Sequence, residues 1–196
     1  MPDSPLHWIL VATAAATVAF FCVGLTSYFE RRPDRPGWVR ALHDTGALLA
    51  LAHVVGAVVF EARADWLVFA GIALYLGAML VFLSAIEAAR SMRMQRSFID
   101  HPLPDRLVTT GPFGWVRHPF YAGYLMGAVA PCVAIAHPAM IAIAVPMIAI
   151  TLSAAFREER VWLSSPRADA YRQYQQRTGM FVPWFGRRGV HRASPV

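Results

Sequence analysis

Two pairs of polar residues stand on either side of a long uncharged stretch, and they carry the side chains best suited to chemistry. Arg117 and His118 precede the stretch, and Glu158 and Glu159 follow it. No acidic, lysine or arginine side chain occurs from 118 to 156. Paired carboxylates at the end of an apolar helix need cationic or hydrogen-bond donor partners. The Arg-His pair supplies such partners if the stretch folds back on itself.

The uncharged stretch predicts a transmembrane helical hairpin. His137 and Pro138 break it near the middle. Each leg is then long enough, as a helix, to cross a hydrocarbon core of about 30 Å. Because a hairpin returns its two ends to the same side, both polar pairs should meet at one membrane face. Any chemistry should take place there.

The residue types at this face suit a zwitterionic ligand that carries a flat ring. The first turn of the helix after Arg117 has free backbone N–H groups, which favour a carboxylate or phosphate. The glutamates favour a cationic group, and aromatic faces stabilise a sulfonium by cation–π attraction. The hairpin entrance is rich in aromatic side chains, namely Phe113, Trp115, Phe120, Tyr121 and Trp162.

Each polar pair also has a simpler interpretation. Arg117 and His118 could anchor the helix among lipid headgroups. The glutamates could lie at a solvated helix end and pair with Arg157 and Arg160 at the surface. The sequence leaves these alternatives open.

The composition is that of an all-α integral membrane protein. Of the 196 residues, 57% are hydrophobic and only 15% charged, which is too apolar for an ordinary soluble domain. The basic residues are all arginines that flank apolar runs, so we expect membrane lipids and no nucleic acid as partners. Cys22 and Cys132 lie in apolar segments without ligand partners at metal spacing, and we therefore expect no metal.

Three further spans precede the hairpin, at 6–29, 41–60 and 66–86, which gives five in total. The first has an apolar run too long for a cleaved signal peptide, so we expect it to be retained. We expect 87–96 to continue the third span as a helix beyond the membrane. Asp44 belongs either at the interface or, less simply, in the bundle interior.

The arginines predict the orientation. All but one of the 18 lie in loops or tails on the same side of the five predicted spans. By the positive-inside rule that side is cytoplasmic. We therefore expect an external N-terminus and a bacterial inner-membrane protein whose active site and C-terminus are cytoplasmic.

A short amphipathic cytoplasmic helix is predicted at 166–178, with Ser165 as its N-cap and Gly179 as its stop. Tyr171 and Tyr174 share one face at i, i+3 spacing and could lie over the hairpin entrance. We expect the apolar tail at 180–184 to touch the membrane interface.

The motifs LVTTGPFGWVRHPFYAG and, after one hairpin, EERVWL and AYRQY resemble the C-terminal catalytic half of the isoprenylcysteine carboxyl methyltransferase family, whose wider relatives include the phospholipid N-methyltransferases. The resemblance covers 105–184. It implies S-adenosylmethionine bound at the cytoplasmic membrane face and a lipophilic methyl acceptor that enters from the bilayer. We accordingly divide the chain into a three-span region at 1–96 and a catalytic region at 97–196.

The resemblance also assigns site residues. The family's later glutamate falls on Glu159, with Glu158 beside it, and we expect Arg157, Glu158 and Glu159 to be the catalytic groups. The cofactor contacts fall on Arg106, Leu107, Val108, Phe113, His118, Pro119, Phe120, Tyr121 and Glu159.

Two positions depart from the prenylcysteine enzymes. Phe113 replaces a tyrosine, which removes a hydroxyl but keeps the ring. Ala155 replaces an acceptor-side arginine, and Arg157 is two positions further along the helix. The second departure argues against a prenylcysteine carboxylate as the acceptor.

Three functions stay open at this point. A methyltransferase is the first, and its carboxylate or phenolate acceptor would need no base. An amine or thiol acceptor must lose a proton, for which Glu158, Glu159 and His118 are available. The others are an NADPH-dependent reductase of the sterol reductase type, whose C-terminal half is similar, and a non-catalytic membrane protein that keeps the fold.

Overall fold

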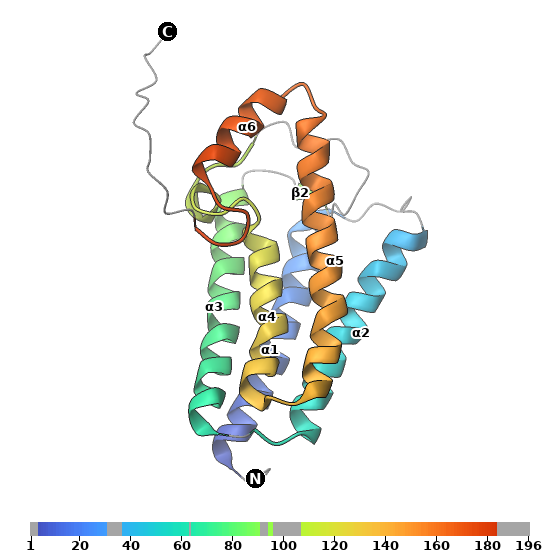
Figure 1. The fold of residues 1–196 in the computed structure, drawn as a ribbon, viewed down its shortest axis with the longest axis vertical. Helices are drawn as coiled ribbons and strands as arrows, with labels where there is room; N and C mark the ends of the chain where they lie inside the picture. The colour runs from blue at the N-terminus through green and yellow to red at the C-terminus, as the bar shows by residue number, and fades with distance from the viewer. Residues whose placement is uncertain (1–3, 31–36, 63, 91–93, 96–106, 184–196) are drawn as a thin grey trace.

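The computed structural model describes residues 4–30, 37–62, 64–90, 94–95 and 107–183. Within these ranges the chain forms a bundle of long helices, with a short helix across one end (Figure 1). Arg106 and the end of the chain after 183 lie outside the described residues. The elements in chain order are α1 (Pro5–Ser27), β1 (Phe29–Glu30), α2 (Gly37–Val59), α3 (Asp65–Ala89), β2 (Met94–Gln95), η1 (Gly111–Gly114), α4 (Pro119–Ile135), α5 (Pro138–Leu163) and α6 (Ala168–Arg177).

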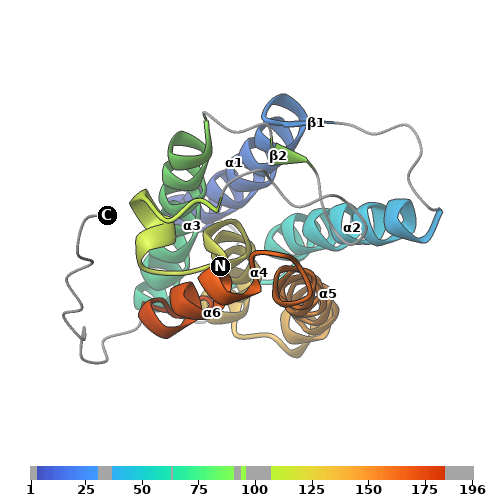
Figure 2. The same ribbon diagram turned by 90° about the horizontal axis from the view of Figure 1, so that it is seen from above.

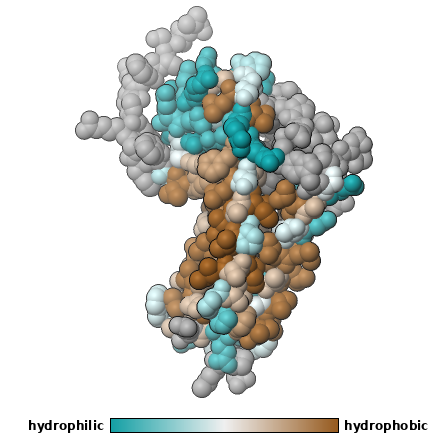
Figure 3. All heavy atoms as spheres, turned by 45° about the vertical axis from the view of Figure 1, so that its right-hand side comes forward, coloured by the Kyte–Doolittle hydropathy of each residue, from teal (hydrophilic) through white to brown (hydrophobic). Residues whose placement is uncertain are grey.

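The described helices confirm the prediction of an all-α integral membrane protein. Four of them, α1, α2, α3 and α5, are long and apolar enough to cross a membrane. The fifth, α4, is apolar but shorter at 17 residues. Figure 3 shows hydrophobic side chains over the middle of the long helices, and hydrophilic side chains gathered at the end that carries α6. The chain is thus a multi-pass membrane protein.

The hairpin turns at the predicted break. Ala136 ends α4 in the left-handed conformation, with φ at 52°. The next residue, His137, is the N-cap of α5 and its side chain accepts a hydrogen bond from the backbone N–H of Ala139. Pro138 follows at the first helical position, where its missing N–H costs nothing. The break at His137-Pro138 is therefore confirmed.

Close backbone packing holds α4 between α3 and α5 (Figures 1 and 2). A β-carbon built on Gly71 of α3 would lie 2.6 Å from the β-carbon of Ala134 in α4. At the other end of the same contact, a β-carbon on Gly123 would lie 3.2 Å from the carbonyl oxygen of Ala78. The small residues therefore let α3 and α4 lie close together along their length. This fixes the start of α4 relative to the bundle.

The first half of α2 leans away from the other helices at the end that carries α6 (Figure 1). Nothing lies within 4 Å of a β-carbon built on Gly46, and Asp44, in the same turn of the helix, is exposed. The bundle-interior alternative for Asp44 is therefore wrong.

Two predicted helix boundaries are also wrong. The third span does not continue as a helix to residue 96, because α3 ends at Ala89 and Met94–Gln95 forms β2, paired in parallel with β1. Pairing with a distant strand satisfies backbone groups that the local sequence would otherwise place in a helix. At the other boundary, α6 starts at Ala168 instead of 166, because the Ser165 hydroxyl accepts the N–H of Arg167 and closes a turn before the helix.

Candidate functional site

The entrance to α4 is seated on the end of α3. Gly111 has φ at 59°, and a β-carbon built there would lie 2.9 Å from the β-carbon of Ala88. Only glycine suits both the conformation and the space. The turn directs Phe113 of η1 into a buried aromatic cluster, where its ring meets Phe120 edge to face at 6.1 Å between centroids. The cluster fixes the first turn of α4.

The chain after α6 pairs with the segment that enters α4. The backbone N–H of Arg117 donates to the carbonyl oxygen of Gly179 at 2.8 Å, and that of His118 donates to Met180 at 3.1 Å. In return, the N–H of Gly179 donates to the carbonyl oxygen of Trp115 at 3.2 Å. These bonds explain why the helix stops before Gly179. They also bring the residues after α6 against the hairpin entrance.

The predicted tyrosine face of α6 covers this entrance. Tyr174 is buried and its hydroxyl donates to the carbonyl oxygen of Phe113 at 2.6 Å. Tyr171 is buried and stacks on Trp162 of α5, with 5.4 Å between centroids. Burial raises the pKa of the Tyr174 hydroxyl, although the Arg117 charge opposes the shift. The hydroxyl therefore stays protonated and keeps donating at neutral pH.

Glu159 is the centre of a hydrogen-bonded group that joins three segments. Its Oε1 accepts from Arg117 Nε at 2.7 Å and lies 3.3 Å from His118 Nε2. Its Oε2 accepts from Gln175 Nε2 at 2.8 Å. The Arg117 and Glu159 side chains are only 11% and 12% exposed. Glu159 thus links the end of α5 to the start of α4 and to α6.

Glu158 has different surroundings. Its Oε1 accepts from the Tyr121 hydroxyl at 2.5 Å, and its Oε2 lies 3.6 Å from His118 Nδ1. The side chain is 27% exposed, more than twice as exposed as that of Glu159. Glu158 is therefore the carboxylate of the pair that is more open to a ligand.

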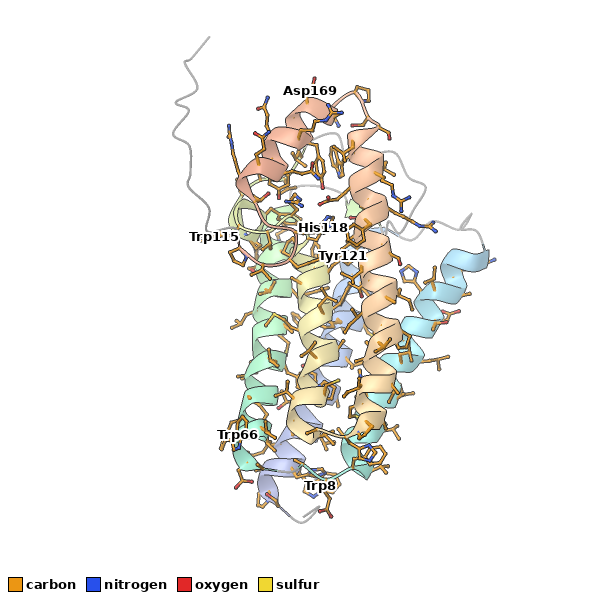
Figure 4. All side chains as sticks on the ribbon, viewed as in Figure 1. Trp8, Trp66, Trp115, His118, Tyr121 and Asp169 are labelled. Carbon is orange, nitrogen blue, oxygen red and sulfur yellow. The ribbon has the colours of Figure 1, made fainter. Side chains whose placement is uncertain are left out.

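His118 lies between the two carboxylates. Figure 4 shows it near Tyr121, at the end of the bundle that carries α6. Its ring is also flanked by Tyr121 and Phe181, at 5.5 and 5.9 Å between centroids. Each ring nitrogen of His118 thus faces a carboxylate oxygen, Nε2 that of Glu159 and Nδ1 that of Glu158. Because the side chain is buried, a headgroup anchor is excluded as its role.

Arg117 does not present its charge to an external anion. Besides Glu159, its guanidinium donates to two backbone carbonyl oxygens at the end of α6, those of Gln175 (Nη1 to O, 3.4 Å) and Thr178. These carbonyls lack partners within the helix, and a cation at a helix C-terminus is stabilising. The Arg117 guanidinium is therefore paired within the protein, and the headgroup-anchor alternative for it is wrong.

The structure brings together some carried-over residues and not others. His118, Tyr121, Glu158 and Glu159 meet, while Arg157 is exposed one position before Glu158. The alternative in which the glutamates pair with Arg157 and Arg160 at a solvated end is wrong for Glu159, which is paired with Arg117. The remaining carried-over residues within the described ranges, Leu107, Val108, Phe113, Pro119 and Phe120, are buried or half-buried around the entrance.

The motifs did not point to Gln175 and Thr178. Both belong to the same helical face as Tyr171 and Tyr174, at i, i+3 and i+4 spacing, and Thr178 is 4% exposed. The tyrosine periodicity would therefore have found them if it had been followed to the end of the helix.

The side chains gathered at the site suit S-adenosylmethionine. Carboxylates suit its ammonium and hydroxyl groups, and aromatic faces suit its sulfonium and its base. The least satisfied acceptor at the site, Glu158 Oε2, stands beside the faces of His118 and Tyr121. Among the described residues, no group of three or more His, Cys, Asp and Glu side chains could hold a metal ion.

Comparison with known protein families finds a match. The family model described as phospholipid methyltransferase matches residues 65–165, from the first residue of α3 to just beyond α5. No curated protein matches the chain. The matched region contains the hairpin, both glutamates and His118, and it amounts to slightly more than half of the chain. The chain belongs to the phospholipid methyltransferase family of membrane methyltransferases.

Proposed function

We propose that this protein is an S-adenosylmethionine-dependent methyltransferase that acts on a lipophilic small molecule or a lipid at the cytoplasmic membrane face. The observation that carries the proposal is the position of His118. It lies between two carboxylates at the polar end of an apolar helical bundle, beneath α6 and the residues after it. Such a site joins aqueous cofactor chemistry to an acceptor dissolved in the bilayer.

The cofactor-holding residues in this proposal are those carried over by the resemblance and gathered at the entrance. Glu159 and His118 supply the polar contacts, and Phe113, Phe120 and Tyr121 supply aromatic surface. Arg106, Leu107, Val108 and Pro119 complete the proposed set. When bound, the cofactor would supply a methyl group on a sulfonium. The methyl carbon would bond in line to the acceptor as its bond to sulfur breaks, with S-adenosylhomocysteine as the leaving group. The protein's part is then mainly to position the reactants and to exclude water.

Glu158 is the proposed proton acceptor for an amine or thiol substrate. Its Oε1 is held by Tyr121, while Oε2 has only a long contact to His118. The N–H or S–H group of the acceptor would give its proton to the Glu158 carboxylate, while the lone pair of the acceptor nitrogen or sulfur forms the bond to the methyl carbon. A catalytic role for Arg157 stays a prediction, as does the division into 1–96 and a catalytic region at 97–196.

Ligand-dependent thermal stability tests the proposed cofactor. The detergent-solubilised protein is heated alone, with S-adenosylhomocysteine and with NADPH. Because a ligand that binds only the folded state raises its stability, we expect S-adenosylhomocysteine to raise the unfolding temperature. A rise with NADPH alone would contradict the proposal and favour the reductase.

The orientation is a separate prediction. Since nearly all arginines lie on one side of the five spans, sites after Pro138 and after Val196 should be on opposite faces, with the second cytoplasmic. Single cysteines placed there, in a background without Cys22 and Cys132, are labelled from each side of membrane vesicles. Labelling of both sites from the same side would contradict the membrane-spanning hairpin and, with it, the proposed site.

The acceptor prediction follows from Ala155. This residue is fully buried against Tyr121, Ala154 and the residues after α6, so no side-chain cation stands at its position. A carboxylate brought in from the membrane would lack a counter-charge there, which is costly. We therefore expect farnesylcysteine analogues to be poor substrates, and neutral or amine-bearing lipophiles to be better.

The acceptor assay measures transfer of a radiolabelled methyl group to four compounds. These are a farnesylcysteine analogue, phosphatidylethanolamine, a long-chain thiol and a long-chain amine. Efficient methylation of the farnesylcysteine analogue alone would contradict the prediction, and would mean that Arg157 reaches the acceptor.

A further inference from the structure

Gln175 is the glutamine of α6 that turns toward the site. Its Nε2 donates to Oε2 of Glu159 at 2.8 Å. The two other glutamines of the helix, Gln173 and Gln176, are exposed. No motif in the sequence assigns a role to Gln175, and it lies after residue 165, where the family match ends.

The hydrogen bond from Gln175 decides which way the Glu159 carboxylate faces. Oε1 is shared by Arg117 Nε and His118 Nε2, whereas Oε2 is held by Gln175. A carboxylate bound at both oxygens cannot rotate about its last bond without losing one partner. The Glu159 side chain is only 12% exposed, so removal of the Gln175 amide would leave its Oε2 with one hydrogen-bond donor fewer and little access to water.

The helix that carries Gln175 is itself held in place. Tyr174 donates to the carbonyl oxygen of Phe113, and Arg117 donates to the carbonyl oxygens of Gln175 and Thr178. The Thr178 hydroxyl in turn donates to the carbonyl oxygen of Tyr174 at 2.7 Å. Because these bonds hold α6 in place, the Gln175 amide has a defined position and can fix the orientation of the Glu159 carboxylate.

We propose that Gln175 is a positioning residue that orients Glu159 and, through it, the imidazole of His118. This orientation of Glu159 and His118 is a feature of the ligand-free protein. Its consequence for cofactor binding rests on the proposed function. Gln175 makes no proposed contact with the cofactor, so its effect on binding is exerted through Glu159.

Three substitutions separate the hydrogen bond from the volume of the side chain. Gln175→Met keeps an unbranched chain and a good helix propensity but removes the donor. Gln175→Lys restores an N–H donor to Glu159. Gln176→Met is the matched control, because it makes the same change at an exposed position on the same helix. Circular dichroism checks that each variant keeps its helix content.

Binding of S-adenosylhomocysteine is the first readout. Loss of a hydrogen bond to a charged group predicts roughly tenfold weaker binding for Gln175→Met. We expect Gln175→Lys to bind near the parent value and Gln176→Met to be unchanged. In methyl transfer, KM for S-adenosylmethionine should rise in Gln175→Met, while KM for the lipophilic acceptor should not.

The second readout is the nuclear magnetic resonance signal of the His118 imidazole in the ligand-free protein, assigned by its loss in His118→Ala. We expect the signal to move in Gln175→Met, to return toward the parent position in Gln175→Lys, and to stay in place in Gln176→Met. If Gln175→Met loses its helix content, Gln175→Glu replaces it, because a second carboxylate beside Glu159 also removes the donor.

The two readouts separate the two proposals. A Gln175→Met variant that matches Gln176→Met in both binding and the His118 signal overturns the positioning role, while the proposed function stands. A His118 signal that responds as expected in a protein that binds no S-adenosylhomocysteine supports the positioning role and overturns the proposed function.

Discussion

His118→Ala and Glu159→Gln should each abolish measurable binding of S-adenosylhomocysteine. His118 lies 3.3 Å from Glu159 through Nε2 and faces Glu158 through Nδ1. A zwitterionic ligand held by few polar groups in a partly dry site loses charge-assisted hydrogen bonds worth about 1.5–3 kcal/mol each. Because each change also removes a partner from the neighbouring group, more than one such bond is lost. Binding should therefore weaken by about a hundredfold or more, below the level that the titration detects. Isothermal titration of the purified protein measures the loss.

The structure also predicts that both variants stay folded. The amide oxygen of Gln at position 159 can still accept the hydrogen bond from Arg117, so the link between α5 and the start of α4 is kept. Glu87→Gln is the matched control, since Glu87 is more than half exposed and pairs with Arg90 away from the site. Binding by His118→Ala and Glu159→Gln at the strength of the parent would mean that the carried-over contacts are wrong.

Arg117→Met should cause the largest loss of stability. The guanidinium bonds to Glu159 and to the carbonyl oxygens of Gln175 and Thr178. Breaking a buried pair by removing one partner costs about 3–5 kcal/mol, because it leaves an uncompensated charge. The end of α6 also loses its cationic partner. The shift in the unfolding midpoint, measured in detergent, gives the size of the effect.

A double variant tells whether the charge pair or the shape of the side chains is responsible. Replacing both members of a buried ion pair with apolar side chains is often neutral for stability. Arg117→Met with Glu159→Met should therefore recover much of the stability lost by Arg117→Met, while cofactor binding stays lost. Arg160→Met is the control, since Arg160 is exposed on α5. An Arg117→Met protein as stable as this control would contradict the account of the pair.

The sequence was sufficient to predict the elements that place the site, because their causes are local. The uncharged stretch and the His137-Pro138 break predict the hairpin, and the hairpin brings Glu159 to His118. The i, i+3 spacing of Tyr171 and Tyr174 predicts the covering helix, whose tyrosines are buried. Each of these inferences depends on a few neighbouring residues and on regular helix geometry.

The hydrogen-bond partners of individual side chains were not predictable in the same way. The position of Arg117 before a helix start is compatible with a headgroup anchor, yet its guanidinium donates to carbonyl groups about sixty residues further along the chain. The tyrosine spacing of α6 places Gln175 on the covering face, but its bond to Glu159 depends on how α6 packs against α5. The end of α3 at Ala89 likewise depends on β1 and β2, which are distant in sequence. Such pairings are set by tertiary contacts and not by local preference.

Transfer of a labelled methyl group in a defined bilayer is the most direct test of the central claim. The parent protein and Glu159→Gln are placed in lipid nanodiscs with methyl-labelled S-adenosylmethionine and the four acceptors described above, and the organic extract is counted. We predict label in an acceptor with the parent protein and background label with Glu159→Gln. Equal labelling by both proteins, or no labelling by a parent protein that binds NADPH, would contradict the account.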